Sequence, residues 1–181
     1  MARKLSPHEL TRLSPQGFQV TKKAPLVMVL DNVRSMHNVG AAFRIADAFL
    51  LERLYLCGIT ATPPHREIHK TALGAEDHVA WEQTQDTLSL IERLKTKGYV
   101  IMAVEQTDVS QPLYTAPYST LQKYAVVFGH EVFGIQESVL SVCDVCLEIP
   151  QYGVKHSLNV SVCMGIVMWE LMRKIKCQTV Q

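Results

Sequence analysis

Short, uninterrupted apolar runs most constrain what this chain can fold into. Residues 26–30 (LVMVL), 99–104 (YVIMAV) and 124–128 (YAVVF) contain no charged side chain. Runs of this length without polar alternation are typical of strands that are buried on both faces of a sheet. We therefore predict that these runs form interior strands of a sheet covered by helices on both sides.

The segments between these runs alternate between helix and strand patterns. Helices are predicted over residues 38–50, 86–97, 136–142 and 157–176, with a short one before Leu73, and further strands over 53–57 and 145–149. Asp86 is the expected N-cap of its helix, and Gly98 follows its end. This alternation predicts an α/β fold with a mostly parallel sheet and helices on both faces.

Length and composition fit one domain behind a short arm. The chain has 181 residues, of which 48% are apolar, and this is enough to bury a core without disulfides or metals. Residues 1–24 are predicted to form a basic helical arm, with Ser6 as N-cap, Glu9 as its reciprocal capping partner and residues 14–17 ending the helix. Residues 25–181 would form the domain.

Positive charge is concentrated in the arm. Residues 1–23 contain five cations, Arg3, Lys4, Arg12, Lys22 and Lys23, against the single carboxylate of Glu9. This segment carries +4, and because the whole chain carries +1, the remainder carries −3. A basic arm on a near-neutral body is suited to phosphate contacts, although a solvated terminus fits the same pattern.

Cysteine content and the lack of long apolar segments indicate a reducing compartment. The five cysteines are an odd number, and the N-terminus leads into no apolar stretch of a signal peptide or membrane span. We expect a cytoplasmic protein that has no membrane partner. We also expect no metal site, because Cys143 and Cys146 lack a second pair, and His65 and His69 lack the companions of a metal motif.

Polar residues and glycines cluster at the ends of three predicted strands. The clusters are residues 38–44 (NVGAAFR), 128–134 (FGHEVFG) and 157–161 (SLNVS). Ligands of parallel sheets bind outside the carboxyl ends of the strands, so we expect one site built from three loops. No Gly-x-Gly-x-x-Gly follows the first strand, which disfavours a Rossmann dinucleotide site.

In this order, the three clusters resemble the three motifs of the SpoU (TrmH-like) branch of the SPOUT RNA methyltransferases. The resemblance runs from about Leu26 to Arg173. It implies a C-terminal trefoil knot, a homodimer, S-adenosylmethionine as cofactor, and methyl transfer to a ribose 2′-hydroxyl of tRNA or rRNA, not DNA. If the chain binds RNA as the resemblance implies, we expect the five cations of the arm to contact the RNA in addition to the domain. The second motif departs from the family pattern at His130, where Asn or another small polar residue is usual, and at Val132, which is often Gly.

The resemblance implies catalytic roles for Arg44, Asn38, Glu131, Ser157 and Asn159. On their own, Asn38 and Ser157 fit helix N-caps, Glu131 fits a cap or a lysine partner, and Asn159 fits the first turn of the last helix. By the same resemblance, backbone groups near Val104, Gly129, Ile149 and Leu158, together with Ser157, hold the adenosine part of the cofactor. We expect this pocket to have backbone dipoles and apolar walls, because a carboxylate beside the sulfonium would stabilise the ground state.

Arg44 lies opposite the apolar face of its predicted helix, between the small residues Ala41 and Ala48. A solvated arginine fits this pattern, but small neighbours also let a ligand or a second chain approach. Guanidinium is always protonated in proteins. We therefore expect Arg44 to hold an RNA phosphate and to stabilise the developing alkoxide, while phosphate oxygen or water takes the proton.

Two alternatives remain open: a base methyltransferase from another SPOUT branch, and a non-catalytic RNA-binding or assembly protein that kept the fold. The combination of Asn38, Arg44, Ser157 and Asn159 argues against both. The third motif and residues 104–107 (VEQT) look most like the tRNA-modifying members, so tRNA is slightly favoured over rRNA.

Overall fold

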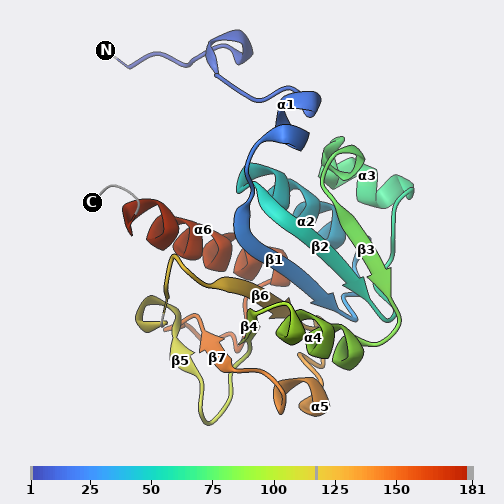
Figure 1. Cartoon of the computed structure of the whole chain (residues 1–181), viewed down its shortest axis with the longest axis vertical. Coiled ribbons are helices and arrows are strands. Elements are labelled where there is room, and N and C mark those ends of the chain that lie inside the picture. Colours follow the sequence, from blue (N-terminus) through green and yellow to red (C-terminus); the bar gives the residue numbers. More distant parts are fainter. Residues whose placement is uncertain (1, 117, 179–181) are drawn as a thin grey trace.

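The computed structural model describes residues 2–116 and 118–178 and contains a seven-stranded sheet (Figure 1). The strand order is β3-β2-β1-β6-β4-β7-β5, and all neighbouring strands run parallel. The strands are β1 (Ala24–Asp31), β2 (Leu51–Cys57), β3 (Trp81–Thr84), β4 (Tyr99–Val104), β5 (Gln111–Pro112), β6 (Lys123–Phe128) and β7 (Val145–Glu148). The predicted α/β class is confirmed, and the trefoil knot stays a prediction.

Helices cover both faces of this sheet. They are α1 (Pro15–Val20), α2 (Met36–Ala48), α3 (Arg66–Ala72), α4 (Thr87–Thr96), α5 (Glu137–Leu140) and α6 (Val160–Gln178), with 3₁₀ turns η1 (Pro7–Glu9), η2 (Ala75–Asp77) and η3 (Leu113–Thr115). Asp86 caps α4 through the amides of Leu88 and Ser89, as predicted. In the described part of the chain, no helix has the length and apolar character that a membrane crossing requires.

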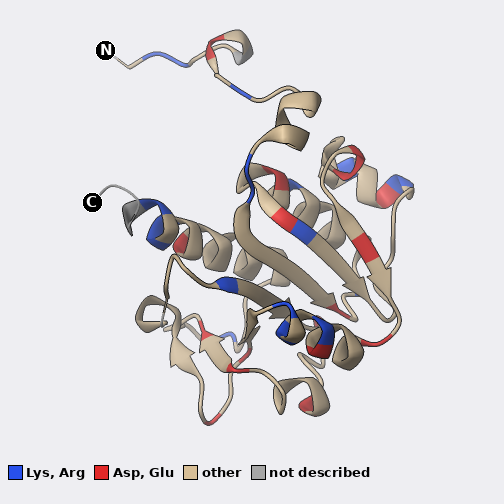
Figure 2. Ribbon diagram, viewed as in Figure 1, with Lys and Arg blue, Asp and Glu red and all other residues tan. Residues whose placement is uncertain are grey.

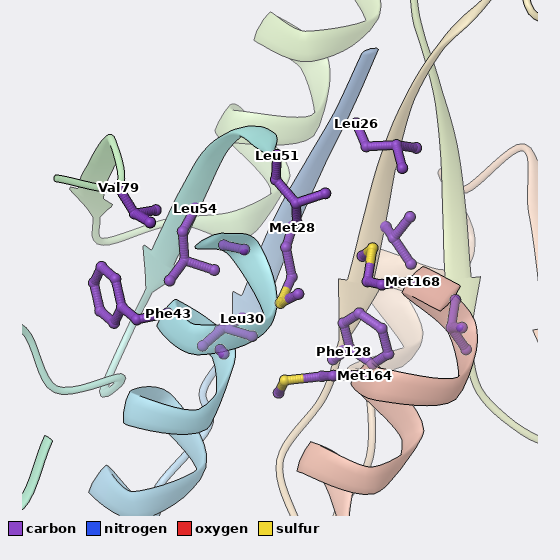
Figure 3. Packing of buried hydrophobic residues seen from close by; sticks show 14 of the residues in the cluster. Leu26, Met28, Leu30, Phe43, Leu51, Leu54, Val79, Phe128, Met164 and Met168 are labelled. Carbon is purple, nitrogen blue, oxygen red and sulfur yellow. The ribbon is translucent and has the colours of Figure 1, made fainter. Parts of the chain in front are cut away.

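Alternate residues of the interior strands belong to two separate apolar layers. Leu26, Met28 and Leu30 of β1 face the layer that contains α2, α3 and α6, whereas Val27 and Val29 face the layer of α4 and α5. Figure 3 shows Met28 and Phe128 beside Met164 and Met168 of α6. Since all five β1 residues are at most 1% exposed, the predicted burial of this strand on both faces is confirmed.

The arm differs from its prediction in two respects. Ser14 does not end a helix but starts α1, because its hydroxyl accepts a hydrogen bond from the amide of Gly17 at 3.0 Å and Pro15 suits the first helical position. The predicted capping interaction between Ser6 and Glu9 is present, with the Ser6 amide 2.8 Å from the Glu9 carboxylate. The element that it caps, however, is the single turn η1.

The end of the arm is anchored to the domain. Phe18 is 4% exposed and belongs to the core, and its ring meets His78 edge-on at 4.9 Å. The ammonium of Lys23 lies over the same ring and donates to the carbonyl of Phe18, so this cation holds α1 in place. Figure 1 shows the chain before α1 leading away from the sheet.

The other four cations of the arm are exposed, and Figure 2 shows them along its ribbon. Arg3 pairs with Glu9 at 3.0 Å, which holds the pKa of that carboxyl at about 2. Arg3 therefore has a partner already, while Lys4, Arg12 and Lys22 extend into solvent. RNA binding by the arm stays a prediction.

Two strands were absent from the prediction because both are short and contain polar residues. β3 (WEQT) and β5 (QP) lie at the two edges of the sheet, where burial does not require a continuous apolar run. The last helix also begins later than predicted, at Val160 instead of Ser157.

Candidate active site

A cavity of about 410 Å³ opens where β4, β6 and β7 end and α6 begins. Seven predicted site residues line it: Val104, Gly129, Glu131, Ile149, Ser157, Leu158 and Asn159. Its volume is in the usual range for small-molecule sites. The structure thus brings the second and third motifs together at the carboxyl ends of parallel strands.

Glu131 connects the first motif to this cavity. Its carboxylate accepts hydrogen bonds from the amides of Arg34 (3.0 Å) and Ser35 (2.9 Å) and from the side chain of Asn38 (2.9 Å). Burial raises the pKa of Glu131, but these three donors outweigh it and the net pKa is lowered. Glu131 is therefore an ionised group that fixes the start of α2 beside the cavity.

The N-cap role predicted for Asn38 is wrong. Ser35 is the N-cap of α2, since its hydroxyl accepts from the Asn38 amide at 3.4 Å. Asn38 lies inside the helix and is 7% exposed. Because Ser35 takes over the cap, the Asn38 side chain is available to donate to Glu131.

The second-motif loop is a tight turn closed by the backbone of His130 and Gly134. The His130 amide lies 3.0 Å from the Gly134 carbonyl, and the Gly134 amide lies 2.8 Å from the His130 carbonyl. His130 Nδ1 accepts from the Val132 amide at 3.0 Å, which is what the carbonyl of an asparagine side chain does in an Asx-turn. The departure at His130 therefore preserves an acceptor for the loop. A Cβ on Gly129 would lie 2.3 Å from the backbone of Gly134, so only glycine fits there.

Glu105 also holds this loop, and the prediction missed it. Its carboxylate accepts from the amides of Ile135 and Gln106, both at 3.0 Å. Gly134 has φ +66°, and a Cβ there would lie 2.2 Å from Glu105 Oε2. Glu105 directly follows β4, so its place after a predicted strand was the signal that could have identified it.

The walls of the cavity are more acidic than predicted. Glu105, Glu131 and Glu148 all line it, which corrects the expectation of walls made of backbone dipoles and apolar groups; of the three, only Glu131 was predicted to be in the site. Each is hydrogen-bonded: Glu148 accepts from the hydroxyl of Ser110 at 2.9 Å, and the other two accept from backbone amides. These carboxylates thus hold the loops, a use that sequence patterns do not reveal.

In the third motif, Asn159 is the N-cap of the last helix, and Ser157 is not. The Asn159 carbonyl oxygen accepts from the amide (2.8 Å) and hydroxyl (2.6 Å) of Ser161. Ser157 lies exposed in the preceding loop and lines the cavity. Gln106 donates to the carbonyl of His156 at 2.8 Å and ties this loop to the end of β4. Cys163 lines the cavity as well, and burial raises the pKa of its thiol.

Arg44 is on α2 but does not line the cavity of its own chain. Its side chain is exposed on the face opposite the buried residues Val39, Ala42 and Phe43. Among the residues that the structure describes, no carboxylate pairs with it. The first motif therefore reaches the site through the hydrogen bond from Asn38 to Glu131, while Asn38 itself does not line the cavity and Arg44 faces outward.

The sequence profile described as the SpoU rRNA Methylase family matches residues 25–169. The 23S rRNA (guanosine-2′-O-)-methyltransferase RlmB of Nitrosomonas europaea is 32% identical over 149 residues, covering 82% of this chain and 56% of the relative. This chain thus spans little more than half the length of that relative.

Solved structures share the fold. The TrmH/SpoU tRNA modifying enzyme of A. aeolicus superposes with a TM-score of 0.78 at 25% identity, over 87% of this chain and 79% of that one. An AdoMet-bound rRNA methyltransferase from Sinorhizobium meliloti gives 0.79 at 24% identity, over 91% and 62%. The profile match spans most of the chain, and it follows that this protein belongs to the SpoU methylase family.

Proposed function

We propose that this chain is an S-adenosylmethionine-dependent RNA methyltransferase that methylates a ribose 2′-hydroxyl. The observation that carries the proposal is the cavity in which residues of the second and third motifs meet and to which Glu131 fixes Asn38 of the first. The RlmB relative is named for guanosine-2′-O-methylation of 23S rRNA. RNA, either tRNA or rRNA, is the substrate class, and the preference for tRNA stays a prediction.

The cavity fits the proposed cofactor. Val104, Gly129, Ile149 and Leu158 come from four separate segments and line one space of about 410 Å³, so backbone groups from several loops are available to an adenosine. When bound there, S-adenosylmethionine would supply an electrophilic methyl group. Glu105 and Glu131 are already hydrogen-bonded to loop amides, so their main contribution is to fix the cavity walls.

The side chains would act by positioning and by charge. Ser157 and Asn159 line the cavity, and their proposed role is to hydrogen-bond the ribose and align its 2′-oxygen. Alignment is the main requirement of an in-line displacement. A cation is needed where the alkoxide develops. Arg44 is the exposed guanidinium of the first motif, and phosphate oxygen or water would accept the proton.

A homodimer would bring Arg44 to the site of a second copy. Val162, Ile166 and Trp169 of α6 are 47%, 39% and 62% exposed and follow helical spacing. Trp169 lies 6.3 Å from Phe49 at the end of α2, so the apolar face is continuous with the helix that carries Arg44. We propose that two copies pair through these faces in the cytoplasm.

Transfer of label from S-adenosylmethionine to total RNA tests the function. Wild type should produce alkali-resistant linkages, because a 2′-O-methyl group blocks cleavage of the backbone, and Arg44→Ala should not. Labelled RNA with no resistant linkage would indicate the base-methylating alternative. Cofactor binding with no labelled RNA would indicate the non-catalytic alternative.

A further inference from the structure

Phe133 is an exposed aromatic residue beside the cavity. Its neighbours Val132 and Gly134 line the cavity, but Phe133 does not, and it is 83% exposed. One flank of its ring lies against His130, with the centroids 4.8 Å apart and the planes at 36°. An exposed phenylalanine on the loop that carries Glu131 has no evident role in folding.

The loop presents this ring from a fixed position. The backbones of His130 and Gly134 are hydrogen-bonded in both directions, at 3.0 and 2.8 Å. The amide of Phe133 lies 3.4 Å from His130 Nδ1, and the Ile135 amide is held by Glu105. Little conformational entropy would be lost when a ligand binds such a surface.

A free cation lies close to this loop. The amide of Arg34 is 3.0 Å from the Glu131 carboxylate, so its backbone is held beside the second motif. The Arg34 side chain is exposed, and among the described residues no carboxylate pairs with it. The loop thus presents an exposed aromatic ring, and the exposed guanidinium belongs to a residue whose backbone is bonded to the same loop. Proteins bind single-stranded nucleic acid with these two kinds of group, the ring by stacking and the cation by charge.

We propose that Phe133 is a stacking platform for a base of the RNA substrate and that Arg34 binds a nearby phosphate. This inference rests on the proposed function, which brings a ribose to the mouth of the cavity. Because Phe133 and Glu131 share one rigid loop, stacking would set the position of the nucleotide relative to the methyl group. Phe133 is therefore a substrate-positioning residue.

Substitutions at Phe133 test the platform. The probe is the RNA fraction, bulk tRNA or deproteinised rRNA, that the wild-type chain methylates. Phe133→Ala should weaken RNA binding by about 5- to 150-fold, the range for loss of one stacked base, and should leave cofactor affinity within about twofold. Phe133→Tyr should retain binding, whereas Phe133→Leu, which has similar bulk but no π-face, should not. Ultraviolet crosslinking followed by mass spectrometry should place RNA on the peptide that contains Phe133.

Two further variants serve as controls. Tyr114→Ala removes a 65% exposed aromatic residue from η3, next to Lys174 near the far end of α6, and should not change RNA binding. Arg34→Gln should weaken RNA binding. It should also reduce the slope of log affinity against log salt concentration by about one, the value for loss of one phosphate contact.

Full RNA affinity in Phe133→Ala, while wild type methylates RNA, would overturn the inference and leave the proposed function intact. Sedimentation separates a second outcome. If the Phe133→Ala dimer dissociates and this dissociation accounts for the lost RNA affinity, the inference fails, because Phe133 is then covered by a second copy. No methylation by wild type would instead contradict the proposed function.

Discussion

The side-chain amide of Asn38 donates to the carboxylate of Glu131 at 2.9 Å across 93 positions of sequence. This bond joins the first motif on α2 to the second-motif loop after β6. The same carboxylate holds the amides of Arg34 and Ser35, so the start of α2 and the loop form one unit. Disrupting this unit should affect stability and activity together.

Asn38→Ala should lower the free energy of unfolding by about 1–3 kcal/mol, because it removes a buried donor from an ionised carboxylate. The rate of methyl transfer should fall as well, since the loop that lines the cavity loses its hydrogen bond to α2. Urea unfolding and initial rates measure the two effects. Gln83→Ala, an exposed position on β3, should change stability by less than about 0.5 kcal/mol. Equal stability of Asn38→Ala and wild type would contradict the coupling.

Gly134→Ala should distort the second-motif loop. Gly134 has φ +66°, and its Cβ would lie 2.2 Å from Glu105 Oε2, so the variant should lose more than about 1 kcal/mol of stability. Calorimetric titration should also show weaker cofactor binding. Gly153→Ala is the matched control, because nothing lies within 4 Å of a Cβ there. If the two variants behave alike, the close approach of Glu105 does not shape the loop.

The sequence was sufficient to predict the architecture because its signals are local. The apolar run 26–30 and the N-cap Asp86 determine β1 and the start of α4 through their own chemistry. The roles of Asn38 and Glu131 were open because their partners are distant in sequence. Asparagine is a common N-cap residue, so the sequence favoured that role for Asn38. The structure shows that Ser35 is the N-cap instead.

Glu105 and Phe133 show two further limits of sequence reasoning. A carboxylate after a strand has many possible partners, and its hydrogen bond to Ile135 forms only when β4 and β6 are adjacent. An apolar residue such as Phe133 is expected to be buried by default, so its 83% exposure is visible only in the structure.

The lowered pKa of Glu131 predicts a pH dependence of stability. A carboxyl whose folded pKa lies below the ordinary 4.5 contributes stability that is complete above 4.5 and is lost as pH falls through the folded pKa. The stability difference between wild type and Glu131→Gln should therefore be constant at neutral pH and shrink below pH 4.5. Urea unfolding of both chains from pH 7 to about pH 3 checks this. A difference that grows on acidification would contradict the hydrogen-bonding account.

Arg44→Ala should slow single-turnover methyl transfer by about 100-fold or more, in the range for loss of a group that stabilises developing negative charge. Arg44→Lys should recover little of this rate, because an ammonium cannot reproduce the bidentate geometry of guanidinium. Cofactor affinity should change little in both variants, since the proposed role of Arg44 is to hold an RNA phosphate and the developing alkoxide and not the cofactor. Near-wild-type turnover of Arg44→Lys with unchanged RNA affinity would show that the geometry of this cation is unimportant.

The proposed reaction in this cavity is methyl transfer from S-adenosylmethionine to a ribose oxygen. The most direct measurement is mass spectrometry of nucleosides from RNA that was treated with the chain and S-adenosylmethionine carrying a deuterated methyl group. We expect the deuterated methyl to remain on the sugar fragment after the glycosidic bond is broken, and this signal to disappear in Arg44→Ala. A deuterated methyl found on the base fragment, or no deuterated nucleoside from either tRNA or rRNA, would contradict it.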